Sequence, residues 1–261
     1  MILSSQLKNK NASIKKLVKK SCKFLFNGEW KGLGNYLVSE ILNILNEKNI
    51  IRNERNLHCS LCNYSSSSFL HKSNSFGISW NSACPCCDSR SRHRGLIFIY
   101  RRYLNIQVGK KILHFAPEPL LEYEIRQHKD HEYYTTDFKM ENVDFPKEDV
   151  QNLNFQTSTF DVLLSNHVLE HVQDDKKAVA EMSRVLKPGG IAIITVPGDW
   201  RRNYTKVFSH LNFNGHYRDY GLDILNILKP NFMKVTKYSL YKNSGEMYAI
   251  KPSEVAFICI K

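Results

Sequence analysis

Four of the seven cysteines stand in two close pairs, a pattern that suits metal chemistry. Cys59 and Cys62 form one C-x-x-C pair, and Cys84 and Cys87 form a second, with residues 63–83 between them. Each pair makes a tight turn that directs two thiolates at one ion, and four thiolates are a typical closed, tetrahedral zinc site. We therefore expect a structural Zn²⁺ on these four residues, with no open position for catalysis.

Further residues near the pairs could compete as ligands. Cys86 is separated from Cys84 by a single residue, which is poor geometry for two sulfurs on one ion, so we expect a free thiol. His71 lies in the polar stretch between the pairs, and we expect it to be solvated. That stretch, SSSSFLHKSNSFGISW, has the serine, glycine and aromatic content of a short two-stranded ribbon.

Polar residues in the C-terminal part follow runs of apolar residues that predict buried strands. Residues 160–165 are an apolar run of strand length, and residues 174–186 repeat apolar side chains at helical spacing before a Lys-Pro-Gly-Gly turn. Residues 191–196 predict a second buried strand. A helix between two such strands indicates a parallel sheet covered on both faces, whose ligands bind beyond the carboxyl ends of the strands. Asn166 and His167 are therefore expected at a binding site.

The stretch 159–197 combines FDV, NHVLEHV, RVLKPGG and VP in one order. It resembles the class I S-adenosylmethionine-dependent methyltransferases of the type 11 kind, in which these pieces span the fourth strand, the fourth helix and the fifth strand. The resemblance covers roughly residues 110–261. It implies an α/β fold with a Rossmann-like, seven-stranded sheet, helices on both faces, and S-adenosyl-L-methionine as the cofactor.

Other runs complete such a sheet. Residues 110–116 (KKILHFA) predict its first strand, and Pro119 suits the first turn of a helix that continues to about residue 128. Residues 132–136 predict the second strand. The alternating runs 233–241 and 254–260 predict an antiparallel pair at the edge of the sheet.

The resemblance also assigns cofactor contacts. The family ends its first strand in an acidic-x-Gly-x-Gly turn, whereas this chain has HFAPEP, so Ala116 and Glu118 stand at the two glycine positions. A side chain there can obstruct a ligand, but Glu118 could meet the ammonium group of the cofactor's methionine part. Asp137 would bind the ribose hydroxyls, with a turn cap as the alternative, and Asp149 would meet the adenine amino group. The expected cofactor-binding residues are Ala116, Glu118, Asp137, Asp149, Asn166 and His167.

A second motif includes the last cysteine pair. The string CPCCDSRSRHR resembles the pattern C-P-x-C-x-S-x-x-R-H-R of a bacterial methyltransferase subgroup that carries an N-terminal zinc ribbon. It opens a predicted helix in DSRSRHRGLIFIYRRYL. Arginines in a first helical turn oppose the helix dipole, so Arg92 and Arg94 are expected either to bind an anionic substrate or to pair with a carboxylate of the protein.

Residues 198–216 form a long connection with little apolar periodicity, which predicts a functional loop or lid. Trp200 lies in this loop, and Arg218 follows it at the start of a helix expected at 219–228; we expect both to contact the acceptor. His216 from the loop and His167 are the candidate general bases, because imidazole titrates near neutral pH. A purely structural role is the alternative for each.

The positive charge of the chain is concentrated in its N-terminal part. Residues 1–110 hold 18 Lys and Arg against 5 Asp and Glu, residues 111–261 hold 19 against 20, and the whole chain of 261 residues carries +12. Residues 5–26 have a basic amphipathic pattern that could bind RNA phosphates or an anionic membrane surface, or pack on the protein. The chain has neither a secretory signal nor a stretch approaching the ~20 apolar residues of a transmembrane helix, so we expect a cytoplasmic protein.

These observations predict three parts: a basic helical segment at 1–56, a four-cysteine zinc ribbon with an arginine-rich linking helix at 57–105, and a class I methyltransferase domain at 106–261. The favoured function is O-methylation of a glycan or small molecule. One alternative is RNA methylation, with the basic zinc module holding the phosphate backbone. The other is a non-catalytic binding protein, suggested by the missing glycines.

Overall fold

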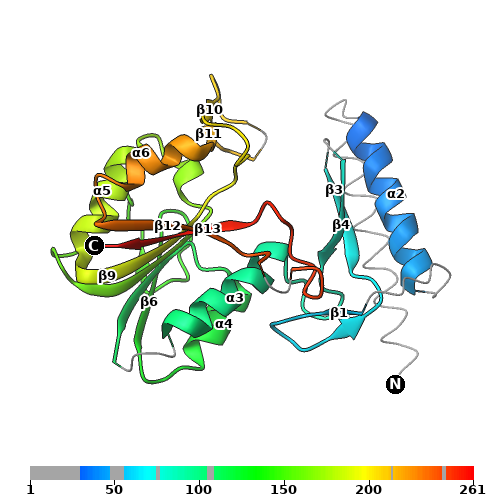
Figure 1. The fold of residues 1–261 in the computed structure, drawn as a ribbon, viewed down its shortest axis with the longest axis horizontal. Helices are drawn as coiled ribbons and strands as arrows, with labels where there is room; N and C mark the ends of the chain where they lie inside the picture. The colour runs from blue at the N-terminus through cyan, green and yellow to red at the C-terminus, as the bar shows by residue number, and fades with distance from the viewer. Residues whose placement is uncertain (1–29, 48–55, 75–76, 105–108, 213, 243–244) are drawn as a thin grey trace. The chain divides into compact units, whose positions relative to one another are not determined.

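The computed structural model describes residues 30–47, 56–74, 77–104, 109–212, 214–242 and 245–261. The chain divides into two compact units, Met1–Arg90 and Ser91–Lys261, whose elements are labelled in Figure 1. By this division the arginine-rich helix, which follows Arg90, belongs to the second unit. The three parts expected from the sequence stay a prediction. The basic helix predicted at residues 5–26 lies outside the described residues.

The first unit contains a long helix and short antiparallel strands. Helix α2 (Trp30–Glu47) contacts the hairpin of β3 (Leu70–Asn74) and β4 (Gly77–Ala83), and β1 (Leu57–His58) pairs with β2 (Ser65–Ser66). The hairpin is the ribbon predicted between the cysteine pairs. Helix α2 includes Gly32 and Gly34, because packing of its buried side, which contains Gly32, Tyr36 and Ser39, outweighs the low helix propensity of glycine.

The second unit is built on a seven-stranded sheet with the order β12-β13-β9-β8-β5-β6-β7. Strands β5, β6, β7, β8 and β9 are parallel to one another, whereas β13 is antiparallel to both β9 and β12. The predicted strands at 110–116 and 132–136 and the predicted antiparallel edge pair are confirmed. The strands are β5 (Lys111–Phe115), β6 (Glu132–Asp137), β7 (Phe145–Pro146), β8 (Phe160–Asn166), β9 (Leu186–Thr195), β12 (Lys234–Ser239) and β13 (Val255–Ile260).

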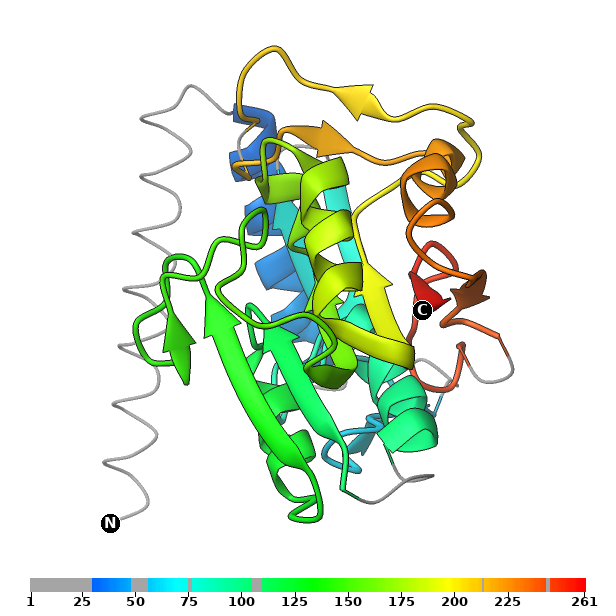
Figure 2. The ribbon, with the colours of Figure 1, turned by 90° about the vertical axis from the view of Figure 1, so that its left-hand side faces the viewer.

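Helices cover both faces of this sheet (Figures 1 and 2). Leu113, Leu163 and Ile194 point to one face, where they join a core cluster with Val179 and Met182 of α5 (Asp175–Val185). The opposite face holds α3 (Ser91–Leu104), which contacts α4 (Pro119–Arg126) and is bonded to β8 through its Tyr100. Among the described residues, no helix has the length and apolar character needed to cross a bilayer.

The Lys-Pro-Gly-Gly segment corrects the sequence prediction, because it is part of a strand and not a turn. Helix α5 ends at Val185, and β9 starts directly at Leu186. Gly189 donates its N–H to the carbonyl of Lys261, and Lys261 donates back to the carbonyl of Gly190. Gly189 has φ +76°, a backbone conformation that favours glycine. The two hydrogen bonds with Lys261 thus make the Lys-Pro-Gly-Gly segment part of the sheet.

The helix predicted at 219–228 is shorter than expected. Arg218–Asp219 form β11, which pairs with β10 (Lys206–Val207), and only η2 (Leu222–Ile224) and α6 (Leu225–Leu228) are helical. Gly221 separates the two parts with an extended backbone. Strand pairing with β10 therefore replaces the first helical turn.

Candidate functional site

Three parallel strands end at the same level in the second unit. Phe115 of β5 pairs with Thr136 of β6 on one side and with Ser165 of β8 on the other. The next residue of each strand is Ala116, Asp137 or Asn166. Three of the predicted cofactor-binding residues therefore lie in one row at the carboxyl edge of the sheet, where open α/β sheets bind their ligands.

Ala116 has a left-handed backbone conformation, which glycine adopts more readily than other residues. Its φ is +49°, and its N–H donates to the carbonyl of Thr136 at 2.9 Å. A left-handed conformation costs an L-residue roughly 1–2 kcal/mol. The loop thus keeps a glycine-like backbone while adding one methyl group.

Glu118 is held by two basic side chains from the first turn of α3. Oε1 of Glu118 accepts from Nε of Arg92 at 2.8 Å, from Nη2 of Arg92 at 2.5 Å and from Nε2 of His93 at 2.8 Å. Burial alone raises the pKa of Glu118, but the hydrogen bond and charge of His93 and the charge of Arg92 lower it to about 2. The other oxygen, Oε2, is buried and has no hydrogen-bond partner among the described residues. Glu118 therefore presents one ionised acceptor that the protein leaves open.

Asn166 lies in a buried polar network between β8 and α3. Its Nδ2 donates to Tyr100 Oη at 2.7 Å and lies 3.3 Å from Nε2 of His114, while its Oδ1 accepts from Thr195. Burial lowers the pKa of His114 to about 4, so this histidine is neutral. These contacts give Asn166 a structural task, and its contact with a cofactor stays a prediction.

Asp137 and Asp149 both brace turns. Oδ1 of Asp137 accepts from the N–H groups of Lys139 and Met140 at 2.6 and 2.7 Å. Oδ1 of Asp149 accepts from the N–H of Gln151 at 2.9 Å. Both residues are partly exposed at the edge of the site. The turn cap weighed as the alternative for Asp137 is present, and the roles of both carboxylates toward ribose and adenine stay predictions.

Three histidines surround a fully buried carboxylate just beyond β8. Glu170, in the short helix η1 (Leu169–His171), is 0% exposed, and neither of its carboxylate oxygens has a hydrogen-bond partner in the described part of the chain. Nδ1 of His167 lies 3.1 Å from Oε1 of Glu170, and Nε2 of His171 lies 4.0 Å from the same oxygen. The ring of His216 meets the ring of His171 edge to face, with centroids 4.8 Å apart. Burial lowers the pKa of His216. The structure thus brings the two candidate bases, His167 and His216, to one carboxylate.

Arg218 and Tyr220 fix the loop that carries this cluster. The guanidinium of Arg218 is buried and donates to the carbonyls of Leu169, Val172 and Gln173. Tyr220 donates to Asp175 at 2.9 Å. Arg218 therefore holds the backbone of residues 169–173, and the acceptor contact expected for it remains untested.

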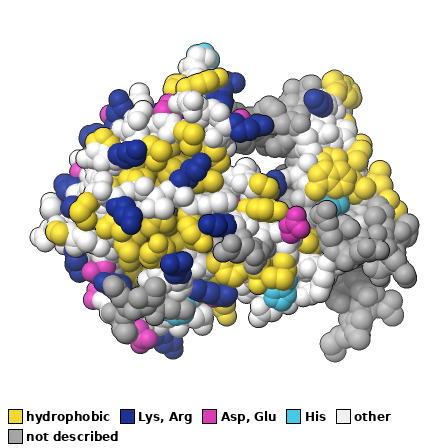
Figure 3. All heavy atoms as spheres, in the orientation of Figure 1, with side chains coloured by type: hydrophobic (Ala, Val, Ile, Leu, Met, Phe, Trp, Pro, Cys, Tyr) yellow, Lys and Arg dark blue, Asp and Glu magenta, His cyan; other side chains and the backbone are white. Residues whose placement is uncertain are grey.

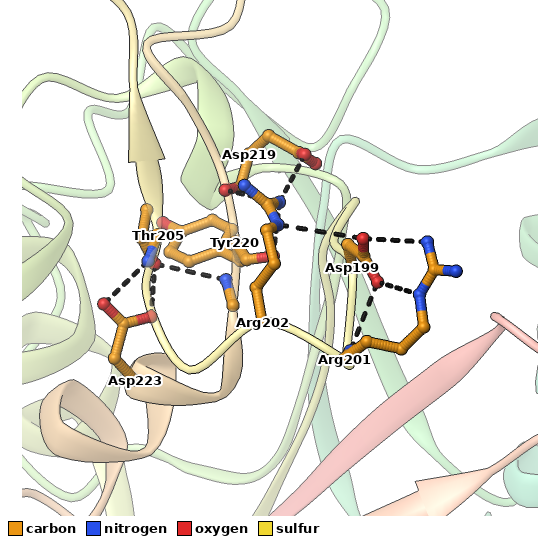
Figure 4. A network of polar contacts seen from close by, with 8 residues as sticks. Asp199, Arg201, Arg202, Thr205, Asp219, Tyr220 and Asp223 are labelled. Carbon is orange, nitrogen blue, oxygen red and sulfur yellow. Dashed lines mark hydrogen bonds and ion pairs between the residues drawn. The ribbon is translucent and has the colours of Figure 1, made fainter.

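A polar network fixes the segments on either side of the candidate lid (Figure 4). Nη2 of Arg202 donates to Oδ2 of Asp219 at 2.6 Å, and Thr205 donates twice to Asp223, from its N–H at 2.8 Å and its hydroxyl at 2.6 Å. Together with the pairing of β10 and β11, these bonds fasten residues 202–207 to residues 218–223. Only the part between these two segments is left as a candidate lid.

Two further predicted substrate residues make structural contacts. Trp200 packs on Phe257, with ring centroids 5.3 Å apart, and its Nε1 donates to the carbonyl of Ser253 at 2.8 Å. Arg94 is fully buried and donates to the carbonyls of Tyr248 and Ala249 at 2.7 Å each. Substrate contacts of both residues stay predictions, whereas their packing roles are clear.

The four paired cysteines converge in the first unit. Their sulfurs all lie within 4.8 Å of one another, with Cys59 to Cys87 at 3.7 Å and Cys62 to Cys84 at 3.6 Å. Zinc–sulfur bonds of about 2.3 Å in a tetrahedron place the sulfurs about 3.8 Å apart. Hydrogen bonding with Cys84 lowers the pKa of Cys59 to about 4. The geometry fits one tetrahedral ion.

The two cysteine turns have the same backbone design. In the first, Asn63 donates its N–H to the carbonyl of Cys59 and has φ +58°. In the second, Asp88 donates to the carbonyl of Cys84 and has φ +55°. Asn and Asp tolerate this left-handed conformation better than other non-glycine residues. Cys86 is exposed and outside the cluster.

His71 corrects the sequence prediction, because it is buried and not solvated. It is 4% exposed, its Nδ1 accepts from the N–H of Asn81 at 3.1 Å, and its Nε2 lies 3.1 Å from the amide of Asn46. Burial lowers its pKa. Helix α2 covers this side of the hairpin, which the local polar sequence did not indicate.

The sequence analysis missed Glu170 as a functional residue. The signal was available, because His167, Glu170 and His171 have the spacing i, i+3, i+4, which gathers side chains on one side of a helical turn. His114, Tyr100 and Thr195 were also missed, since a buried polar network between distant elements leaves no local pattern.

The strand order and the single antiparallel strand inserted beside β9 define the fold of the class I methyltransferases. Residues 106–194 match the family model described as a methyltransferase domain. This part of the chain is therefore a class I methyltransferase domain.

Named relatives cover only short parts of the chain. Norajmaline N-methyltransferase of Rauvolfia serpentina is 43% identical over 54 residues, which are 21% of this chain and 18% of the relative. An uncharacterized methyltransferase of Schizosaccharomyces pombe is 40% identical over 52 residues, 20% of this chain and 19% of the relative. The aligned part thus spans about a fifth of the length of either relative.

Solved structures give a similar picture at lower identity. The Burkholderia thailandensis 1,6-didemethyltoxoflavin-N1-methyltransferase with S-adenosylhomocysteine has a TM-score of 0.48 and 16% identity, and the match covers 66% of this chain and 78% of that one.

Proposed function

We propose that the protein is an S-adenosylmethionine-dependent methyltransferase that methylates an oxygen of a glycan or small-molecule acceptor. The observation that carries the proposal is the open, ionised Oε2 of Glu118, two residues beyond Ala116 in a methyltransferase domain. A buried anionic oxygen without a donor is costly unless a ligand supplies one.

The residues of the row fit the cofactor. The ammonium group of the methionine part would donate to Glu118, beside the backbone of Ala116. Asp137 would accept from the ribose hydroxyls, because its two turn-capping bonds end on Oδ1 and leave Oδ2 for the ligand. Asp149 would accept from the adenine amino group. Bound S-adenosylmethionine supplies an electrophilic methyl group.

The histidine cluster supplies what an oxygen acceptor needs. A hydroxyl must lose its proton as it attacks, so a positioned base accelerates its methylation. His167 follows β8 directly and is partly exposed, while its Nδ1 faces Glu170. In the proposed reaction Nε2 of His167 takes the acceptor proton, and the Glu170 carboxylate stabilises the resulting imidazolium. His216 is the second candidate base.

Two measurements test the proposal. Calorimetric titration with S-adenosylhomocysteine should give heat and a rise in melting temperature, because the ligand binds only the folded state. No heat and no thermal shift would instead support a non-catalytic binding protein. Incubation of a cell extract with isotopically labelled S-adenosylmethionine, followed by mass spectrometry, should then reveal a labelled small molecule or glycan with a methyl ether.

RNA is the second candidate acceptor, favoured by the concentration of positive charge in residues 1–110. In the second unit, Lys and Arg side chains are scattered among hydrophobic ones on the face shown in Figure 3, which gives no continuous basic stripe on that face. RNA binding through phosphates would weaken steeply as salt is added. Affinity that does not change between low and high salt would exclude this candidate.

We also propose that Cys59, Cys62, Cys84 and Cys87 hold a structural Zn²⁺. The spacing of the sulfurs and the matched backbone turns support it. Four thiolates fill a tetrahedral shell, so the ion would stabilise the first unit without activating water. Unpaired thiols fit the reducing cytoplasm expected from the sequence. Elemental analysis of the purified chain should find one zinc bound to this cluster.

A further inference from the structure

The cluster of Glu170, His171 and His216 offers three ligand atoms to one point. One nitrogen or oxygen of each residue lies within 4.8 Å of those of the other two. Two imidazoles and one carboxylate are a common ligand set for divalent first-row transition metals. The three residues come from two segments, η1 and the turn before β11, so the site depends on the tertiary fold.

Glu170 provides the charge that such an ion requires. Its side chain is completely buried, and both oxygens are without a hydrogen-bond partner among the described residues. The contact of 3.1 Å with Nδ1 of His167 lacks hydrogen-bond geometry. Burying a carboxylate in this state is expensive, because nothing replaces the hydrogen bonds of water. A cation bound at the exposed side of the cluster would remove this cost.

The ring of His171 is already set in the form that binds metal. Its Nδ1 lies 3.0 Å from the carbonyl oxygen of Gly215, which can only accept, so Nδ1 carries the proton. In the neutral ring Nε2 then has its lone pair free, and Nε2 is the atom that lies 4.0 Å from Oε1 of Glu170. Metal-binding histidines usually donate their second nitrogen to a carbonyl or carboxylate in this way. His171 is exposed on its outer side, so an ion can reach it from solvent.

The segment that carries His216 is fixed at the same place. His216 donates its N–H to Oδ1 of Asn212 at 3.0 Å, and Gly215, with φ +75°, donates to the carbonyl of Asn212 at 2.8 Å. Tyr217 donates its N–H to the carbonyl of Glu170 at 2.8 Å. These bonds join the two ligand-bearing segments. Metal bonds of about 2.0–2.2 Å allow two ligand atoms on one ion to lie up to about 4.3 Å apart, so small side-chain rotations complete the site.

We propose that Glu170, His171 and His216 bind a divalent transition-metal ion beside His167, with open positions left for water or an oxygen of the acceptor. In this arrangement His216 is a ligand, and His167 is left as the candidate base. The ion would be separate from the four-cysteine cluster and would not depend on methyl transfer for its binding. An oxygen bound to such an ion has a lower pKa and is more readily deprotonated, which suits a hydroxyl acceptor next to the base.

Cobalt titration of the full chain, with zinc already bound to the cysteines, tests this proposal. We expect one additional Co²⁺ per chain, with visible absorption typical of nitrogen and oxygen ligands and without a thiolate charge-transfer band. H171Q and H216Q should each lower the affinity more than about a hundredfold, since even residues that only orient the ligands change it 10–100-fold. E170Q should do the same, whereas H210Q, which removes an exposed histidine, should bind as the unmodified chain does.

The result does not depend on the fold of one variant or on enzyme activity. Circular dichroism and melting curves identify any variant that fails to fold, and the other two then decide. Absence of Co²⁺ binding, a spectrum with the thiolate band, or unchanged binding in folded E170Q and H216Q would each overturn the proposal. Retained S-adenosylhomocysteine binding in the same variants would show that the cofactor site is unaffected, so the two proposals can fail separately.

Discussion

Nε2 of His93 lies 2.8 Å from Oε1 of Glu118, which links the first turn of α3 to the N-cap of α4. An acidic residue at an N-cap usually bonds to the N–H groups of its own helix, but Glu118 makes no such side-chain bond. Arg92 and His93 hold this carboxylate instead. The two residues at the start of α3 thus keep an ionised carboxylate at the expected cofactor site. This carboxylate also offsets the unfavourable interaction of basic residues in the first turn of α3 with the helix dipole.

The first prediction concerns cofactor affinity. E118Q should weaken S-adenosylhomocysteine binding by about ten- to a hundredfold, because a hydrogen bond to a charged group contributes about 1.5–3 kcal/mol. E124Q is the matched control, since Glu124 pairs with Arg101 and the same two helices carry both ion pairs. Isothermal titration of both variants measures the effect. Equal affinities in E118Q and E124Q would exclude Glu118 from the cofactor site.

The second prediction concerns stability in acid. The pKa of Glu118 is about 2 in the folded chain and 4.5 as its ordinary value, so the folded state favours the ionised form. Its contribution is therefore complete above pH 4.5 and is lost as the pH falls toward 2. The full amount is about 3 kcal/mol. Both chains retain His114, so its own loss of stability in acid largely cancels in the comparison. Urea unfolding of the unmodified chain and E118Q should differ most near pH 6 and converge only as the pH approaches 2; a constant difference would contradict this.

The third prediction distinguishes Cys84, an expected zinc ligand, from Cys86, an expected free thiol, in the second cysteine turn. C84S should lose the zinc and destabilise the first unit, whereas C86S should keep one zinc per cysteine cluster, because Cys86 is exposed and outside the cluster. Elemental analysis and chelator-induced unfolding measure both. Zinc loss in C86S with retention in C84S would reverse the assignment.

Much of the sheet could be predicted from local patterns. Apolar runs that end in polar residues located β5 and β8, and the alternating runs located β12 and β13. Strand β6 was also expected at its place, residues 132–136. The start of β9 could not be predicted, because Gly189 and Gly190 hydrogen-bond to Lys261, at the far end of the chain. Partners so distant in sequence leave no signal in a local window.

In the candidate site, too, some features could be predicted from local sequence and others could not. Ala116, Asp137 and Asn166 lie in one row because strand ends of a parallel sheet align, and their contacts with a cofactor stay predictions. The buried state of Glu170 could not be predicted, since an acid in a stretch such as VLEHV is expected to face solvent. Its burial results from η1 packing under the segment that contains Tyr217 and Arg218.

The fourth prediction tests the base. With an acceptor in hand from the labelling experiment, H167Q should lower kcat by about 10²–10⁴-fold with little change in KM, because a general base acts in the transition state. H210Q again provides the control. A turnover of H167Q equal to that of H210Q would remove His167 as the base.

The fifth prediction concerns the two segments that flank the candidate lid, residues 202–207 and 218–223. A Cβ on Gly221 would lie 2.2 Å from the carbonyl oxygen and 2.6 Å from the carbonyl carbon of Tyr204, both backbone atoms that cannot move aside cheaply. G221A should therefore cost about 3 kcal/mol and lower the melting temperature by roughly 6–12 °C. The clash would also disturb the bond from Gly221 N–H to Thr205 and the network of Figure 4.

Substitution of a second glycine, Gly34, shows whether the loss of stability is specific to Gly221. Gly34 lies in α2, and nothing is within 4 Å of the position where its Cβ would be. G34A should leave stability unchanged or raise it by up to about 1 kcal/mol, because alanine has the higher helix propensity. Calorimetric melting of both variants provides the comparison. If G221A melts as G34A does, the backbone contact with Tyr204 is not a constraint, and the segment 202–207 is free to move as part of the lid.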